Sequence, residues 1–201
     1  MKPRLLDLFC SEGGASVGYA RAGFDVVGVD IAPQPRYPFE FHQADALTFL
    51  AEHAHEFDAF AASPPCPHYA NVTRWRGDQS NHPDLIPPTR DLLRSTGRPW
   101  VIENVMGAPM TVHFMLCGSM FGLPVRRHRQ FEVGGWSPDL VLTPPCAHRR
   151  DDIPFMHKNE RAFADALGCE WMSARGGRQA IPPAFTEFIG CQLLEALAVS
   201  S

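Results

Sequence analysis

Two places in the sequence bring a reactive side chain to the end of an apolar run. Cys66 lies in the proline-rich residues 63–67 directly after one such run, and Glu103 and Asn104 together end another. A thiol at the carboxyl end of a strand is well placed for nucleophilic attack, whereas a buried structural cysteine is the simpler alternative. A carboxyl directly after Ile102 is costly to bury unless it has a partner or a function. These residues predict a thiol nucleophile that works beside a carboxyl group.

A glycine turn near the start of the chain has the composition of a ligand-binding loop. Gly13 and Gly14 follow the apolar run 5–9, and Asp30 ends the next apolar run. In parallel sheets a ligand binds at the carboxyl ends of the strands, where such a turn lets the backbone approach and an acidic residue further along binds a ribose. The Gly-x-Gly-x-x-Gly fingerprint of NAD enzymes is absent, which argues against a dehydrogenase. A plain tight turn and a surface aspartate form the alternative interpretation.

Asp45 is a second acidic candidate, and it comes after the next expected strand. Its carboxylate could accept a hydrogen bond from an adenine amino group, or it could simply cap the helix that follows it. The local sequence leaves both interpretations open.

The apolar periodicity around these residues predicts alternating strands and helices. The predicted strands are residues 5–9, 26–30, 58–62, 100–103 and 130–133. The predicted helices are residues 15–22, 47–53, 90–95, 159–167 and 186–197. The first strand, the first helix and the second strand form a βαβ unit, which requires a parallel sheet. We therefore expect an α/β sheet flanked by helices.

The composition favours one domain over residues 1–201. The chain is 45% hydrophobic and 20% charged, which suffices for one sizeable core, and residues 134–177 are interpreted as an insertion at one rim of the sheet.

No apolar run reaches the length of a membrane span and no signal-peptide core follows Met1, so we expect a cytoplasmic protein without membrane contact. The formal net charge of −4 excludes a polybasic tail that binds polyanions by charge alone.

The six cysteines include no Cys-x-x-Cys pair, so neither a disulfide framework nor a ribbon-type zinc site is indicated. Two Cys-x-His pairs are present, Cys66 with His68 and Cys146 with His148. Structural zinc sites normally use Cys-x-x-Cys and His-x-x-x-His spacing, and a catalytic thiolate bound to zinc could not add to a substrate. The sequence therefore predicts no metal.

Five motifs, spread over nearly the whole chain, resemble in the same order those of the DNA cytosine-5 methyltransferases. They are Asp7-Leu8-Phe9-Cys10-Ser11-Glu12-Gly13-Gly14, Pro64-Pro65-Cys66, Glu103-Asn104-Val105, Arg127-His128-Arg129 and Ala180-Ile181-Pro182-Pro183. The chain looks like the compact members of this family that bacteriophages often encode, which would place it in a bacterial host's cytoplasm. The resemblance implies a Rossmann-like, S-adenosylmethionine-dependent methyltransferase sheet flanked by helices, with the short insertion 134–177 in place of a large target-recognition domain.

The resemblance also implies catalytic roles. In this family a cysteine thiolate adds across the 5,6 double bond of cytosine, and Cys66 matches that nucleophile. Glu103 matches the residue that gives N3 a proton or a strong hydrogen bond, which requires a raised carboxyl pKa. Asn104 is expected to fix that carboxylate or the neighbouring loop. Arg127 and Arg129 match the family's Arg-x-Arg, near the pyrimidine oxygen and a backbone phosphate, and the alternative for both is a solvated strand end.

The implied methyl donor is S-adenosylmethionine. Phe9, Gly13 and Gly14 would surround its methionine and adenosine parts, Asp30 would bind its ribose and Asp45 would lie at its adenine. The residues expected at the cofactor are Phe9, Ser11, Glu12, Gly13, Gly14, Asp30, Ile31, Asp45, Ala46 and Pro65.

The first motif departs from the family pattern at two positions. Ser11 stands where glycine is usual and narrows the backbone freedom. Glu12 stands at a position that is more often small or apolar, and its charge would favour the donor's amino group or sulfonium and oppose its carboxylate. These departures imply a lower donor affinity, a different donor position or a loss of activity, and the sequence does not decide among them.

The short insertion limits the kind of DNA recognition that we expect, because it has too few residues to form a large domain that contacts bases in the major groove. We expect duplex DNA with the target cytosine flipped out, short or weak sequence specificity, and phosphate contacts that outweigh base reading. The residues expected to make these contacts are His148, Arg149, Arg150, Lys158 and the loop 69–77. The alternatives are a free cytidine nucleotide, a single strand, or a catalytically silent DNA-binding relative. No obligatory protein partner is indicated.

Overall fold

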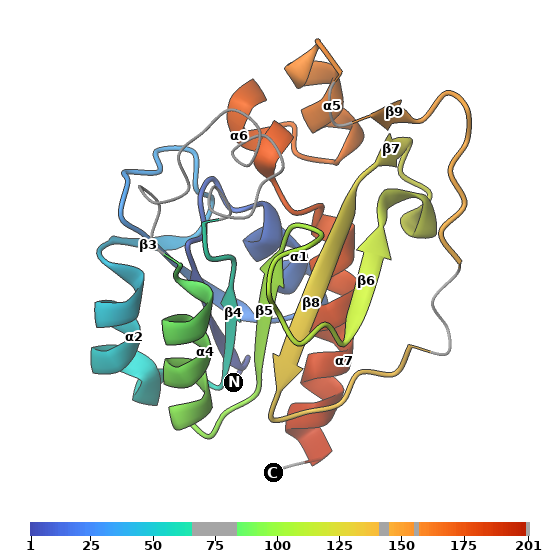
Figure 1. Ribbon diagram of the computed structural model, residues 1–201. Helices are drawn as coiled ribbons and strands as arrows, with labels where there is room; N and C mark the ends of the chain where they lie inside the picture. Colours follow the sequence, from blue (N-terminus) through green and yellow to red (C-terminus); the bar gives the residue numbers. More distant parts are fainter. Residues whose placement is uncertain (66–83, 141–144, 155–156, 200–201) are drawn as a thin grey trace.

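A mixed seven-stranded sheet forms the centre of the protein in the computed structural model, which describes residues 1–65, 84–140, 145–154 and 157–199 (Figure 1). The strand order is β3-β2-β1-β4-β5-β8-β6. The strands of the sheet are β1 (Arg4–Leu8), β2 (Asp25–Asp30), β3 (Glu40–Gln43), β4 (Ala59–Ala62), β5 (Trp100–Asn104), β6 (Phe114–Cys117) and β8 (His128–Gly134). Strands β1 to β5 run parallel, and β8 is antiparallel to its neighbours β5 and β6. The expected α/β sheet is confirmed.

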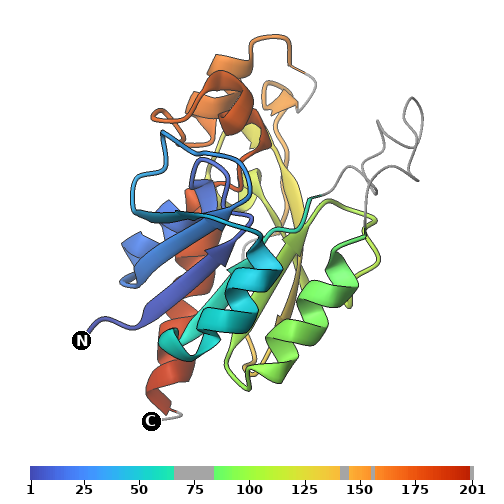
Figure 2. The ribbon, with the colours of Figure 1, turned by 90° about the vertical axis from the view of Figure 1, so that its left-hand side faces the viewer.

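Helices cover both faces of this sheet (Figure 2). On one face lie α1 (Gly14–Ala22) and α7 (Pro183–Val199), and on the other lie α2 (Ala46–His53) and α4 (Ile86–Ser95). Two short 3-10 helices, η1 (Ala54–Glu56) and η3 (Gly118–Phe121), follow α2 and β6. None of the described helices is both long and apolar enough to cross a membrane.

The hydrophobic core has two layers, one on each side of the sheet. Leu5 and Val26 point toward the layer formed with α1 and α7, whereas Leu6 and Val27 point toward the layer formed with α2 and α4. Successive strand residues face opposite sides, so strands covered on both faces are apolar throughout. This is why the central strands appear in the sequence as continuous apolar runs.

The contact between α1 and α7 is unusually close. A Cβ on Gly18 would lie 2.0 Å from Thr186 Oγ1, so only glycine fits at that crossing. The Thr186 hydroxyl in turn donates to the Ala15 carbonyl at 2.8 Å. The two helices therefore pack as one unit although they lie far apart along the chain.

A smaller group of elements lies above the carboxyl ends of the parallel strands (Figure 1). It consists of β7 (Val125–Arg126), β9 (Ile153–Pro154), α5 (Glu160–Ala166) and α6 (Ala174–Gln179). Strands β7 and β9 pair with each other in parallel. Buried Phe163, Leu167 and Met172 give these elements a small apolar cluster of their own. Residue 177, the expected end of the insertion, lies inside α6.

Candidate active site

The carboxyl ends of four parallel strands meet at one edge of the sheet. Leu8 pairs with Val29 on one side and with Ala62 on the other, and Ala62 pairs with Ile102. The next residues along these strands are Phe9, Asp30, Ser63 and Glu103. The structure therefore places Phe9 and Asp30, two of the predicted cofactor residues, at the same edge as the predicted catalytic carboxyl of Glu103.

The loop between β1 and α1 follows a strained backbone path. Phe9 and Ser11 have φ angles of 60° and 49°, and Gly13 has a φ of 86°. The left-handed region costs a residue with a side chain about 1–2 kcal/mol, whereas glycine enters it freely. Ser11 thus occupies the conformation in which the glycine usual at this position would carry no such cost.

Asp30 fixes this loop to the end of β2. Its Oδ2 accepts a hydrogen bond from the Ser11 amide at 3.0 Å, and its Oδ1 accepts one from the Ala32 amide at 2.9 Å. A carboxylate offers about four acceptor positions, so these two bonds leave capacity for ribose hydroxyls. Ile31 follows with 72% of its surface exposed, an unusual exposure for a large apolar side chain.

Asp45 caps α2. Its Oδ1 accepts hydrogen bonds from both the amide and the hydroxyl of Thr48, each at 2.9 Å. These bonds lower the pKa of the Asp45 carboxyl, which lies exposed at the surface. The capping interpretation is confirmed, and a contact with adenine stays a prediction. Ala46, the first residue of α2, is buried.

A buried polar chain under the glycine loop was missed by the sequence interpretation. The Tyr37 hydroxyl donates to Ser16 Oγ at 2.9 Å, and the Ser16 hydroxyl donates to Asp7 Oδ2. Burial raises the pKa of Asp7 to about 7; the bond from Ser16 opposes this rise, and the charges of Asp30 and Glu103 add to it. The aspartate in the middle of an apolar strand was the available signal, since an acid is rarely buried without a function or a partner.

Glu103 forms an ion pair with Arg129 at the end of β5. Arg129 Nε lies 2.5 Å from Glu103 Oε1, and the two side chains are 12% and 10% exposed. Burial raises the pKa of Glu103, whereas the charges of Arg129 and Arg127 and a hydrogen bond from Ser63 lower it, and the net direction is upward. The raised carboxyl pKa expected from the resemblance is thus present, with a cation held against the same group.

Asn104 holds the backbone that leads toward the predicted nucleophile. Its Nδ2 donates to the Pro64 carbonyl at 3.0 Å, and its Oδ1 accepts from the Val105 amide at 2.9 Å. Of the two roles expected for Asn104, these bonds correspond to fixing the neighbouring loop. Pro65 is exposed at the end of that segment, and Cys66 lies outside the described residues, as do His68 and the loop 69–77.

Arg127 has a different environment from Arg129. It is 2% exposed, and its Nη2 donates to the carbonyls of Gln179 and Ala180 at 2.6 and 2.8 Å. Its guanidinium also lies 6.0 Å from the centre of the Phe163 ring. The solvated-strand-end interpretation is therefore wrong for Arg127, because this buried residue between β7 and β8 is bonded to the end of α6 and to the residue that follows it.

Glu12 faces α6. Its carboxylate accepts hydrogen bonds from the Ser173 amide at 2.5 Å and from the Ser173 hydroxyl at 2.6 Å, and its carbonyl accepts from Trp171 Nε1 at 3.0 Å. Ser173 is the N-cap of α6, where a negative charge is favourable. Both carboxylate oxygens are therefore bonded to Ser173, and the expected action of the Glu12 charge on the donor stays a prediction.

Solved structures share this architecture. The S. pombe Dnmt2 methyltransferase aligns with 98% of this chain and 99% of its own at 13% identity and a TM-score of 0.62. The chain has a methyltransferase fold. A DNMT2 mutant from Spodoptera frugiperda aligns with 81% of this chain and 59% of its own at 19% identity and a TM-score of 0.50. At these identities the likeness shows the fold alone.

A putative prophage DNA modification methyltransferase from E. coli is also similar, at 22% identity and a TM-score of 0.42. It covers 66% of this chain, which in turn covers 46% of that protein. The chain thus spans less than two thirds of this protein and of the Spodoptera one. No protein-family model and no curated protein matches the sequence.

Proposed function

We propose that the chain transfers a methyl group from S-adenosylmethionine to carbon 5 of cytosine in DNA through a covalent adduct with Cys66. The observation that supports this most is the buried Glu103 carboxyl, paired with Arg129 at 2.5 Å and adjacent in sequence to Asn104. Asn104 in turn holds the Pro64 carbonyl, two residues before Cys66. The proposed proton donor and the segment that leads to the proposed nucleophile thereby lie at the same strand end.

The residues around the glycine loop fit the proposed methyl donor. Asp30 keeps acceptor capacity at the end of β2, and exposed Ile31 offers an apolar surface beside it. The glycine loop brings backbone close to the same edge, as nucleotide-binding loops in parallel sheets do. S-adenosylmethionine supplies an electrophilic methyl group on sulfur when it is bound. The chain's own contribution is to hold ribose through Asp30 and to orient the donor along the loop.

The proposed reaction needs one further group, a base that takes up the carbon 5 proton. The Cys66 sulfur bonds to carbon 6 of cytosine while N3 takes a proton from Glu103, which leaves carbon 5 nucleophilic. Carbon 5 takes the methyl group as the carbon–sulfur bond of the donor breaks. A base then removes the carbon 5 proton, the bond from Cys66 to carbon 6 breaks, and the N3 proton returns to Glu103. Arg129 holds the Glu103 carboxylate in the intervening state.

DNA is the substrate that the surface charges favour. Arg126, Arg149, Arg150 and Lys158 are exposed on the side of the smaller group of elements. The Arg126 guanidinium donates to the carbonyls of Arg149 and Arg150 at 2.9 and 3.3 Å, which gathers three cations on one surface. Clustered cations of this kind bind phosphates without reading bases.

The proposal is tested by supplying labelled methyl donor with duplex DNA, single-stranded DNA and dCMP in parallel. We expect label in the duplex, at carbon 5 of cytosine. If dCMP becomes labelled and DNA does not, the substrate is a nucleotide and not DNA. Donor binding without transfer to any of the three would indicate a silent relative.

The nucleophile is tested separately with duplex DNA that contains 5-fluorocytosine. The fluorine cannot leave as the carbon 5 proton does, so the adduct should be trapped and should map to Cys66. Cys66→Ser should form no adduct and transfer no methyl group, while donor binding persists. Cys191→Ser, an exposed cysteine on α7, is the control and should retain both. An adduct at Cys10 or Cys146 would reassign the nucleophile.

A further inference from the structure

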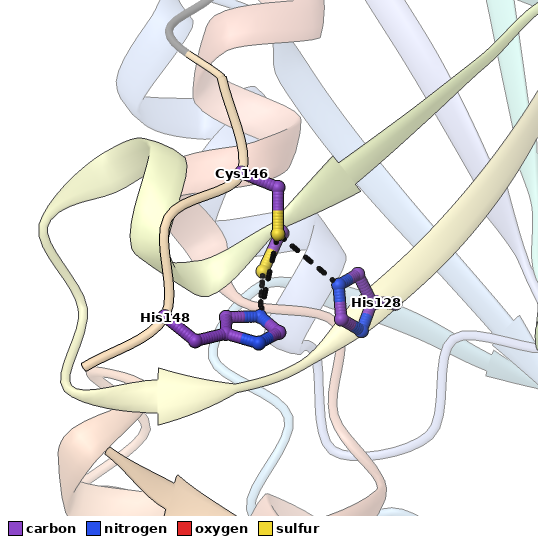
Figure 3. Close-up of side chains that lie close together, drawn as sticks. His128, Cys146 and His148 are labelled. Carbon is purple, nitrogen blue, oxygen red and sulfur yellow. Dashed lines mark hydrogen bonds between the residues drawn. The ribbon is translucent and has the colours of Figure 1, made fainter. Parts of the chain in front are cut away.

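Four side chains with metal-binding atoms converge beside the start of β8. Their ligand atoms all lie within 4.8 Å of one another, and the residues are Cys117, His128, Cys146 and His148. Figure 3 shows the rings of His128 and His148 directed toward the Cys146 sulfur. None of the four belongs to the proposed catalytic or cofactor residues.

Three of the separations are close to those of a tetrahedral metal site. Cys117 Sγ lies 3.0 Å from His148 Nε2, and Cys146 Sγ lies 3.3 Å from His148 Nε2 and 3.4 Å from His128 Nε2. Zn–S bonds of about 2.3 Å and Zn–N bonds of about 2.0–2.1 Å place tetrahedral ligand atoms about 3.3–3.8 Å apart. These three distances lie within a few tenths of an ångström of that range, and the widest separation in the set, up to 4.8 Å, would have to close by about 1 Å to admit the ion.

Two of the ligands are held rigidly by the sheet. Cys117 ends β6 and is fully buried, and His128 begins β8 directly opposite it in the antiparallel register. Residues opposite each other in such a pair point to the same face, with Cβ atoms about 4.5–5.5 Å apart. Half of the ligand set is therefore positioned before any metal binds.

Ser119 connects these strands to the segment that carries the other two ligands. Its Oγ lies 3.3 Å from Cys117 Sγ and 3.8 Å from Cys146 Sγ, and it accepts a hydrogen bond from the Ala147 amide at 3.1 Å. Hydroxyl groups beside coordinating sulfurs orient the ligands and stabilise thiolate charge. The cluster thus has an outer layer of support of the kind that metal sites require.

The segment 145–150 needs an attachment to the sheet. All six of its residues are exposed, and no strand or helix forms there. Burial of apolar surface therefore contributes little to holding it, and the hydrogen bonds from Arg126 are themselves exposed. A metal that joins Cys146 and His148 to β6 and β8 would supply the missing free energy, because metal binding to a structural site is folding free energy.

We propose that Cys117, His128, Cys146 and His148 bind one zinc ion in a structural Cys2His2 site. Two sulfur and two imidazole ligands in tetrahedral arrangement select zinc among the common divalent ions, and four protein ligands leave no open position for catalysis. Binding replaces the two thiol protons, which are released to solvent. The expectation of no metal considered spacing along the chain, whereas this site combines a cross-strand pair with a Cys-x-His pair.

The metal content of the full chain tests the proposal directly and needs no enzymatic activity. Protein purified with zinc and dialysed against metal-free buffer should retain about one zinc ion per chain. The cobalt-substituted protein should show the intense visible absorption of a tetrahedral ion and a thiolate-to-cobalt charge-transfer band. The double variant Cys146→Ser, His148→Gln should lose both the bound zinc and these bands. Both residues are exposed, so the variant keeps the core intact.

A matched control separates this site from adventitious metal binding. The double variant Cys191→Ser, His55→Gln removes an exposed thiol and an exposed imidazole elsewhere, and it should retain the full zinc content. Wild-type protein that holds no zinc after dialysis, or a Cys146→Ser, His148→Gln variant that holds as much as the wild type, would overturn the proposal. A Cys117–Cys146 disulfide found by mass mapping in freshly reduced and zinc-treated protein would overturn it as well.

Discussion

Glu103 allows the strictest test of mechanism at the scale of single residues. Its raised pKa keeps a proton on the carboxyl at a higher pH than an exposed glutamate would, and in the proposed mechanism that proton goes to N3 of cytosine. We expect Glu103→Gln to bind donor and DNA but to lose several powers of ten in single-turnover rate, each worth about 1.4 kcal/mol of barrier. In the wild type the rate should fall as the pH rises through the pKa of Glu103.

The control for this variant is Glu160→Gln, which removes a carboxyl that begins α5 and pairs with Arg178 at 2.9 Å. It should change the transfer rate little. Full activity in the Glu103→Gln variant would show that the carboxyl has only a structural role, as the ion-pair partner of Arg129.

Ser11 tests the strain in the glycine loop. Because its φ of 49° lies in the left-handed region, Ser11→Gly should raise the free energy of unfolding by about 0.5–1 kcal/mol, the relief of strain less the entropy cost of glycine. Urea denaturation measures the change. Ser95→Gly near the end of α4 should lower stability instead, since it introduces glycine into a helix. A loss of stability in Ser11→Gly would mean that the hydroxyl has a role of its own.

The residue scale also shows how far sequence patterns predict side-chain roles. Glu103 and Asn104 were placed correctly at a strand end, because an apolar run fixes where a strand stops. The partners of Glu12 and Arg127 were not predictable, since Ser173 and Gln179 lie far along the chain and meet them only through tertiary packing.

At the scale of elements, Asp7 makes the stability of β1 and α1 depend on pH. Its pKa of about 7 in the folded state, against an ordinary carboxyl value near 3.8, means that the folded chain holds a proton that the unfolded chain has released between about pH 4 and pH 7. The proton on Asp7 stabilises the folded state, and this stabilisation is complete below about pH 4 and is lost as the pH rises through about 7. One pKa unit corresponds to about 1.4 kcal/mol, so the total is at most about 4.5 kcal/mol.

Asp7→Asn should therefore flatten the decline of unfolding free energy between pH 5 and pH 8. The Asn carbonyl can still accept the hydrogen bond that Ser16 donates to Asp7. Urea denaturation at both pH values measures the difference, and Asp25→Asn, at an exposed position on β2, serves as the comparison and should leave the slope unchanged. An unchanged slope in Asp7→Asn would assign the pH dependence to another group.

Strand β6 and helix α6 are among the elements that the sequence interpretation missed, and they were missed for different reasons. Strand β6 has four residues, too few for a periodicity to emerge, and it gains its partners only from β8. Helix α6 contains Gly176 and Gly177, which lower helix propensity, and it forms because Ser173 caps it and α5 packs against it. The longer elements were predictable because burial on both sheet faces leaves a continuous apolar signal.

At the scale of the whole molecule, charge is unevenly distributed. Residues 126–178 carry nine lysines and arginines against seven acids, whereas the rest of the chain carries nine against fifteen. If exposed cations of this segment bind DNA phosphates, the affinity for duplex DNA should fall steeply with salt and depend little on sequence. Titrations at several salt concentrations measure the slope, and Arg149→Gln with Arg150→Gln should reduce it by about 2.

The matched comparison for this prediction is Arg94→Gln with Arg98→Gln, which removes two arginines at the end of α4 and just beyond it, outside the charged segment. This variant should keep the wild-type salt slope. A slope near zero in the wild type, with dCMP as an effective competitor, would contradict binding through phosphates and favour a nucleotide.

The contact between α1 and α7 has a consequence for how the protein is made. The hydrogen bond from Thr186 to Ala15 joins residues 171 positions apart, and the crossing at Gly18 cannot form without the later helix. At 5–20 residues per second the ribosome needs roughly 10–30 seconds to synthesise the residues between them. During that interval the apolar face of α1 and the glycine loop before it stay uncovered. The first motif to emerge from the ribosome is therefore among the last to be completed, and the nascent chain is exposed to chaperones and proteases until α7 follows.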